Sequence, residues 1–130
     1  MKLSYFCLVL SFFCPTVWSS NWQPLLDKSL SQWDTYLSYK HKESYDGSIP
    51  KDKNGQPIAP IGLNTGNDIY QVFTIIEQDN QPVLRISGKI YGAVISKESY
   101  RNYHLKLQFR WGHKKWPPRE NKLRDSGILY

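Results

Sequence analysis

The chain has 130 residues, a formal net charge of +6 at pH 7 and 15% aromatic residues. Its only cysteines, Cys7 and Cys14, lie within the first twenty residues, so the rest of the chain has neither a disulfide framework nor paired cysteines for zinc. A glycine-rich phosphate-binding loop is also missing from the sequence, which leaves nucleotide chemistry without its usual motif. The protein must therefore be stable through packing alone.

The first twenty residues have the pattern of a secretory signal peptide. Lys2 provides a positive start, residues 3–13 are rich in apolar side chains, and Ser19 is a small residue at a plausible cleavage site. The apolar run is too short to span a bilayer, which takes about 20 residues; a retained membrane anchor is the alternative. We therefore expect residues 1–20 to be a signal peptide, the protein to be exported to the periplasm or outside the cell, and no integral membrane segment.

The remaining chain, residues 21–130, begins with a short turn. Asp27 is expected to accept hydrogen bonds from backbone N–H groups as a cap. Trp22 and Trp33 are expected to be core rings, because Trp is heavily buried on average.

Residues 36–68 carry three prolines and four glycines and show no periodicity. Within them, residues 51–55 read Lys-Asp-Lys-Asn-Gly, which is a turn signal. A run this long without a helix or strand pattern is uncommon inside a domain and is often functional. We expect an ordered loop that wraps the edge of a sheet.

The strand patterns begin after this loop. Residues 69–77 are rich in β-branched and aromatic side chains, residues 78–82 are a turn, and residues 83–87 are the expected antiparallel partner. Residues 90–95 resume the strand pattern, with Gly92 allowing a bend or a bulge.

Residues 103–111 have the clearest alternation in the chain, and this predicts a strand with one buried and one solvated face. We expect Phe109→Asp to cost several kcal/mol and Gln108→Asp to cost little, because only the first would bury an unpaired charge. Residues 128–130 look like the start of another strand, so we expect the chain to be the front part of a longer protein. The expected buried side is formed by Tyr103, Leu105, Leu107, Phe109 and Trp111.

Strands that follow one another without a long helix are typical of an antiparallel β-sandwich or jelly roll. Four stretches carry a further resemblance: LLDKSLSQW (25–33), VLRISGKIYGAVISKESY (83–100), NYHLKLQFRWG (102–112) and RDSGILY (124–130). Together they resemble the 3-keto-disaccharide hydrolase family, which also includes 3-keto-glucoside lyases and hydratases. The resemblance covers residues 22–130, and it implies an all-β, antiparallel, concanavalin-like (jelly-roll) β-sandwich that continues past Tyr130. The usual family start has Asn or Asp followed by Gly-Lys, whereas here Asp27 runs directly into Lys28.

The resemblance implies an exported carbohydrate-active enzyme that acts on 3-keto-glycosides. The ketone at C3 acidifies the C2 proton, so a base removes that proton, the group at C1 is eliminated, and water adds back to give net hydrolysis. Such a site needs a base, an electrophile for the enolate oxygen and an acid for the leaving oxygen. A divalent metal could serve as the electrophile and is the only cofactor expected. The alternative is a non-catalytic carbohydrate-binding β-sandwich module, because function does not follow from a fold.

Asp125, Arg124 and Arg110 are the candidate catalytic residues. Asp125 could be the base or a ligand, although Asp before Ser-Gly also commonly caps a turn. Arg110 could donate two hydrogen bonds to a sugar or an enolate oxygen, or pair with a carboxylate on the sheet. His104 shares the polar side of residues 103–111, but a single His is a weak metal candidate, since metal sites need several convergent ligands. No metal ligand is assigned.

The loop after Trp111 supplies the candidate substrate-binding residues. Its alternation of basic residues with Trp is also how proteins hold single-stranded nucleic acid. An exported protein seldom meets that partner, and one loop is a small footprint for it. We therefore expect a small carbohydrate, a 3-keto-glycoside, as the partner and no nucleic acid. The candidate binding residues are Trp111, Lys115, Trp116, Arg119 and Ser126.

Overall fold

The computed structural model describes residues 22–40 and 48–130. The expected signal peptide at residues 1–20 lies outside the described residues, and so does the part of the long loop at 41–47. Within the described ranges no helix is long and apolar enough to cross a membrane. The elements in chain order are β1 (Trp33–Leu37), β2 (Gly62–Leu63), α1 (Asn67–Tyr70), β3 (Phe73–Gln78), β4 (Gln81–Ile86) and β5 (Gly92–Ser96).

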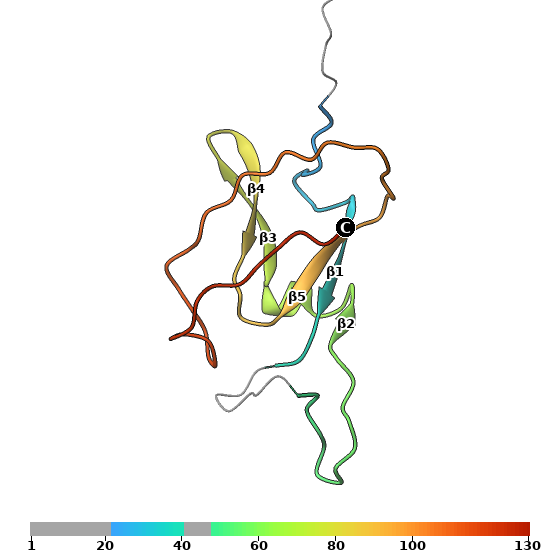
Figure 1. The fold of residues 1–130 in the computed structure, drawn as a ribbon, viewed down its shortest axis with the longest axis vertical. Coiled ribbons are helices and arrows are strands. Elements are labelled where there is room, and N and C mark those ends of the chain that lie inside the picture. The colour runs from blue at the N-terminus through green and yellow to red at the C-terminus, as the bar shows by residue number, and fades with distance from the viewer. Residues whose placement is uncertain (1–21, 41–47) are drawn as a thin grey trace, which may run out of the picture.

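The strands form two small antiparallel sheets (Figure 1). The first has the strand order β2-β1-β5, and the second is the hairpin β3-β4. In the first sheet Trp33 pairs with Ser96 and Leu37 pairs with Gly92. The regular structure in the described residues is therefore antiparallel β apart from one four-residue helix, which confirms the all-β class.

The core lies where the two sheets meet. Leu37 of β1 and Phe73 of β3 are buried, together with Val72 and Ile90 from the segments that lead into β3 and β5. Burying one such side chain contributes about 1.5–3 kcal/mol, so this cluster holds the sheets together. Partly buried hydrophobic residues pack around it: Leu30, Ile61, Tyr70, Leu84 and Val94.

The first strand was not predicted. β1 begins at Trp33 and lies in the part of the sequence where only a turn and a loop were expected. Thr35 and Leu37 point to the buried side of the sheet, but five residues are too few to show a period of two with any force. At the end of the long loop, Leu63 of β2 pairs with Tyr36 of β1, so only this end of the loop lies along the sheet edge, where the whole loop was expected to do so.

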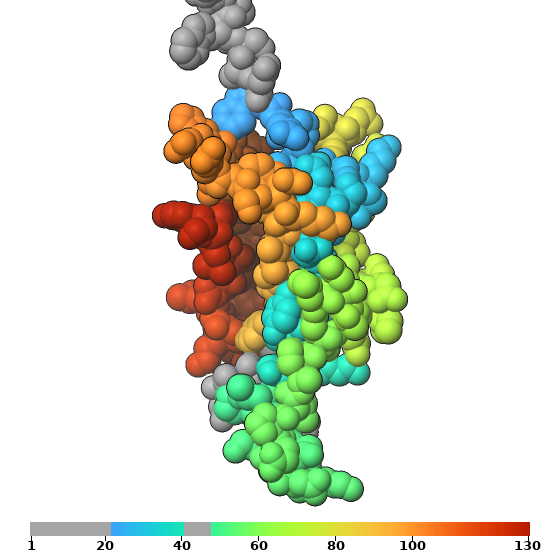
Figure 2. Space-filling model, turned by 90° about the vertical axis from the view of Figure 1, so that its right-hand side faces the viewer, coloured from blue at the N-terminus to red at the C-terminus, as the bar shows by residue number. Residues whose placement is uncertain are grey.

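The turn signal at residues 51–55 is confirmed. The Asp52 carboxylate accepts hydrogen bonds from the backbone N–H groups of Asn54 and Gln56, at 2.8 and 2.9 Å. Gly55 takes a positive φ of 78°, which glycine adopts without steric cost. The loop that contains this turn projects away from the sheets, as the green segment of Figure 2 shows.

The hairpin was predicted, but its first strand is shorter than residues 69–77. Residues 69–70 belong to α1, and β3 begins at Phe73. The change occurs because the Asn67 side chain bonds to both backbone groups of Phe73, each at 2.8 Å. Asp79 and Asn80 close the hairpin with φ values of 51° and 58°, as two-residue turns of type I′ require. β4 and β5 also fall within two residues of the predicted bounds.

The predicted strand at residues 103–111 is wrong. No strand forms there, and all nine residues are exposed, including Leu107 at 59% and Phe109 at 73%. A period of two favours a strand only if a neighbouring strand supplies hydrogen bonds, and the described part of the chain provides no such partner for this segment. Residues 128–130 likewise form no strand and are exposed. In Figure 1 the chain after β5 passes around the sheets as an irregular ribbon.

Neither of the two tryptophans expected in the core is fully buried. Trp22 is 56% exposed, which contradicts the prediction. Trp33 is half-buried, and its indole N–H donates to the carbonyl of Leu25 at 2.5 Å. Buried Trp rings usually satisfy this polar edge, so Trp33 fixes the chain where it enters β1. Gly92 opens β5 and pairs with Leu37 in an uninterrupted register, so no bulge forms between β5 and β1.

Candidate basic-loop site

Residues 112–124, named here the basic loop, are attached to the hairpin sheet through Trp116. The indole N–H of Trp116 donates to the carbonyl of Ser87 at 2.9 Å, and the half-buried ring lies against Gly88. Two turns shape the loop beyond this point: the Arg119 N–H donates to Trp116 O and the Lys122 N–H donates to Arg119 O, both at 3.0 Å. The loop is therefore folded on itself and held at the end of β4.

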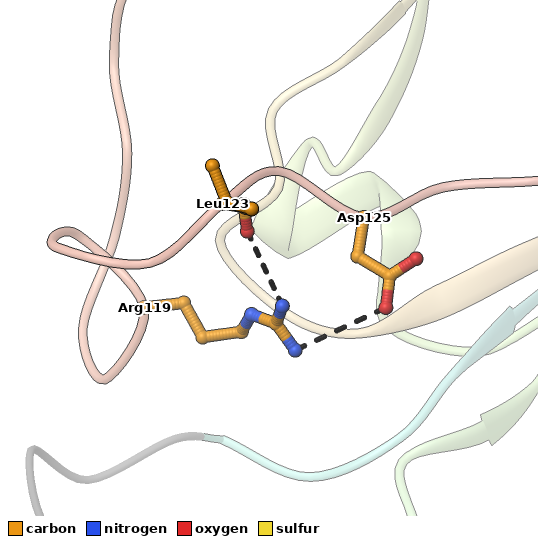
Figure 3. Close-up of polar contacts among 3 residues, drawn as sticks. All are labelled: Arg119, Leu123 and Asp125. Carbon is orange, nitrogen blue, oxygen red and sulfur yellow. Dashed lines mark hydrogen bonds and ion pairs between the residues drawn. The ribbon is translucent and has the colours of Figure 1, made fainter.

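Asp125 lies beside Arg119, and Figure 3 shows the Arg119 guanidinium between two acceptors. One is the Leu123 carbonyl at 3.2 Å, and the other is the Asp125 carboxylate at 4.0 Å. The two charged side chains are 44% and 80% exposed, and such exposed pairs contribute little to stability. The Asp125 carboxylate is consequently accessible to a ligand.

Arg124 closes the basic loop. Its guanidinium donates to the carbonyls of Lys114 and His113, at 3.2 and 3.0 Å, and lies 5.9 Å from the centre of the Trp111 ring. Lys115 also joins two parts of the loop, because its ammonium donates to the carbonyl of Lys122 at 2.8 Å. Both cations hold the loop closed, which the sequence did not indicate.

Trp111 has an exposed ring at the start of the basic loop. The ring is 48% exposed and meets Phe109 edge-on, with 5.6 Å between centroids and 81° between planes. Arg110, between these two rings in the chain, turns to the hairpin and donates to the Gln78 side chain at 3.0 Å. The structure thus brings Trp111 and Arg124 together, and Arg119 and Asp125 together, while Arg110 contacts β3. Ser126 and His104 are exposed.

Two lysines beside Trp116 were missed by the sequence reasoning. The Lys114 ammonium lies 3.8 Å from the centre of the Trp116 ring, and the Lys89 ammonium lies 5.6 Å from it. Each cation over a Trp face is worth about 0.5–1 kcal/mol at an exposed site. Lys114 is near Trp116 in the sequence and could have been found, whereas Lys89 comes from the β4–β5 connection.

The expected divalent metal has no suitable group of ligands in residues 22–40 and 48–130, since no three His, Cys, Asp or Glu side chains there could hold an ion together. We therefore derive no chemical step through a metal.

The carboxylate of Asp27 has a lowered pKa. Hydrogen bonds from the Ser31 side chain, and then from the backbone N–H groups of Ser29 and Ser31, lower it to about 2. The cap expected at Asp27 is confirmed.

A separate hollow of about 360 Å³ lies on the β3–β4 hairpin. None of the candidate residues from the sequence lines it. An exposed ion pair, Lys28 with Glu77 at 4.0 Å, lies at its border. The lining residues are Lys28, Ile75, Ile76, Glu77, Asn80 and Pro82.

Comparison of the chain with protein-family models, with curated proteins and with solved structures found no match.

Proposed function

We propose that this protein is an exported carbohydrate-active enzyme that cleaves 3-keto-glycosides, built on a concanavalin-like β-sandwich. The motif resemblance in residues 102–112 and 124–130 is the origin of this proposal. The observation that supports it is the accessible Asp125 carboxylate, which is joined to Arg119 of the basic loop, while the exposed Trp111 ring lies at the start of that loop. An exposed ring can stack on a sugar face and an accessible carboxylate can act as a base, and a sugar-binding site with a base requires both.

In this proposal Asp125 removes the C2 proton of the bound 3-keto-glycoside. The electron pair of the C2–H bond moves toward the C3 carbonyl, and the enolate oxygen then carries the developing negative charge. The guanidinium of Arg119, 4.0 Å from the Asp125 carboxylate, donates to that oxygen in this proposal. Collapse of the enolate expels the oxygen at C1, which takes up a proton from solvent as it leaves, and addition of water across the new C1=C2 bond completes net hydrolysis. Arg124 keeps the loop closed and orients Trp111.

The test uses the full chain with a 3-keto-glucoside and the matching unoxidised glucoside. We expect aglycone release from the 3-keto-glucoside alone, because without the ketone no side chain removes the C2 proton at neutral pH. Asp125→Asn is expected to lower turnover by about 100-fold or more, the lower range for loss of a general base. Asp68→Asn, an equivalent change at an exposed position of α1, is the matched control and should leave turnover unchanged.

A second function, non-catalytic carbohydrate binding, is favoured by one observation. The basic loop and its contacts bring together several cations but a single ion-paired carboxylate, Asp125. Elimination also needs an acid for the leaving oxygen, and ordinary glycosidases need two carboxylates. Saturable binding of both sugars without cleavage of either would identify this second function, while equal cleavage of both would contradict both proposals.

A further inference from the structure

The charge of the protein is concentrated at one end of the chain. Eight of the 17 Lys and Arg residues, but only two of the 11 Asp and Glu residues, lie in residues 101–130. This segment therefore carries the whole net charge of +6, and residues 1–100 are balanced. Figure 2 shows that the segment, coloured orange to red, lines one side of the molecule. A surface with one sign of charge attracts ligands of the opposite charge.

Two of the positive charges on this side are held against the same half-buried ring. Trp116 is fixed by its bond to Ser87 O, and the ammonium groups of Lys114 and Lys89 lie 3.8 and 5.6 Å from its centre. Neither lysine forms an ion pair with a carboxylate within the described residues. The ring thus positions two ammonium groups from different parts of the chain, without neutralising either.

The arrangement of the aromatic rings favours a saccharide over single-stranded nucleic acid as the anionic ligand. Single-stranded nucleic acid is held by successive rings on which bases stack face to face. Here Phe109 and Trp111 are nearly perpendicular, at 81°, and the Trp116 ring already carries Lys114 at 3.8 Å. A sugar needs only a single open ring and donors for its polar groups; the exposed Trp111 provides the ring, and Lys89 and Lys114 provide donors.

We propose that the basic loop and Lys89 form a binding surface for an acidic saccharide, whose carboxylates are held by Lys89 and Lys114 and one of whose rings lies on Trp111. This inference rests on the proposed function, because it takes the ligand to be a carbohydrate, and it adds that the saccharide is a uronate. Carboxylate oxygens accept charge-assisted hydrogen bonds from ammonium groups. The contacts leave both lysines available for this role, whereas Lys115 and Arg124 are used on backbone carbonyls.

The test measures binding of trigalacturonate to the full chain by calorimetry, beside its neutral methyl ester. At low salt we expect the ester to bind about tenfold more weakly, and at 0.5 M salt, where the Debye length is only about 4 Å, we expect most of this difference to vanish. Lys89→Gln combined with Lys114→Gln should weaken trigalacturonate binding about tenfold. Lys51→Gln combined with Lys53→Gln is the matched control, since it removes two exposed charges from the 51–55 turn, and it should leave binding unchanged.

Three outcomes would overturn the inference. Equal binding of the acid and the ester would mean that charge does not select the ligand. An equal loss in both lysine double variants would mean that net charge acts and that Trp116 positions nothing. Tighter binding of a single-stranded oligonucleotide than of trigalacturonate would identify a nucleic-acid surface. Cleavage of a neutral 3-keto-glucoside by the same preparation is measured separately, so failure of this inference is distinct from failure of the proposed function.

Discussion

At the scale of single residues, Gly92 shows why a side chain can be forbidden inside a strand. A Cβ atom at this position would collide with the carbonyl oxygen of Tyr36, and it would lie 3.1 Å from Leu37 and 3.2 Å from Phe73. The backbone oxygen cannot rotate away, so β5 would have to move from β1. The sequence suggested a bend or bulge here, whereas glycine is needed because the strands and the core approach closely.

We expect Gly92→Ala to lower the free energy of unfolding by about 1–3 kcal/mol, the usual cost of overpacking a well-packed site. Gly112→Ala is the control, because a Cβ atom there meets no atom within 4 Å, and it should change stability by less than about 0.5 kcal/mol. Urea unfolding of both variants measures the difference. Equal stabilities would mean that β1 and β5 are farther apart than the structure places them.

Asp27 gives a prediction about pH. Its pKa is about 2 in the folded protein, chiefly because the Ser31 side chain and two backbone N–H groups donate to the carboxylate. A depressed folded pKa means that ionised Asp27 stabilises the fold above the unfolded value of about 4, and that this contribution is lost as the pH falls toward 2. In an NMR titration, Ser31→Ala should raise the pKa of Asp27, because it removes the largest cause. An unchanged titration midpoint would show that Ser31 does not act on this carboxylate.

At the scale of elements, the β3–β4 hairpin depends on its two-residue turn. Asn80 has a φ of 58°, a conformation that β-branched residues strongly avoid and that Gly and Asn tolerate. We expect Asn80→Val to destabilise the protein by about 1–3 kcal/mol, and Asn80→Gly to be tolerated. Thermal unfolding of the two variants separates them. Equal melting temperatures would mean that residue 80 does not adopt a left-handed conformation.

The hairpin could be predicted because its signals are local. The β-branched residues of β3 and the turn residues Asp79 and Asn80 act over a few positions, and the partner strand follows at once. Residues 103–111 show a regular alternation of apolar and polar residues, yet they form no strand. Alternation describes which side chains would share a face, but hydrogen-bonding partners come from elsewhere in the chain, and the segment itself carries no information about them.

The candidate site was predictable only in part, for a related reason. The sequence placed Trp116 and Arg119 on one loop and Asp125 a few residues after it, and the structure joins Arg119 to Asp125. The sequence could not show that the Arg124 guanidinium donates hydrogen bonds to carbonyls ten and eleven positions earlier. Nor could it show that Lys89 reaches the Trp116 ring. Contacts across the fold depend on how the loop is anchored at β4, which is a property of the tertiary structure.

At the scale of the whole molecule, the chain exposes apolar side chains in the same segment that carries its net charge. Tyr103, Leu105, Leu107, Phe109 and Trp111 are all between 45% and 73% exposed. Contiguous apolar patches on soluble proteins mark contact surfaces, while like charges keep copies of a molecule apart. The balance between these two effects depends on ionic strength, because salt screens the repulsion and leaves the hydrophobic attraction.

We therefore expect the full chain to self-associate at high concentration, and more strongly at 0.5 M salt, where charge is screened over about 4 Å. Phe109→Asp should reduce this association. Gln108→Asp introduces the same charge at the neighbouring position of the alternation and should reduce it less. Because the Phe109 ring is 73% exposed, the unfolding free energy should change by less than about 0.5 kcal/mol in both variants, in place of the large loss expected for a buried strand. Sedimentation velocity over a concentration series measures the association. An equal effect of the two substitutions would assign it to charge and not to the exposed apolar side chains of residues 103–111.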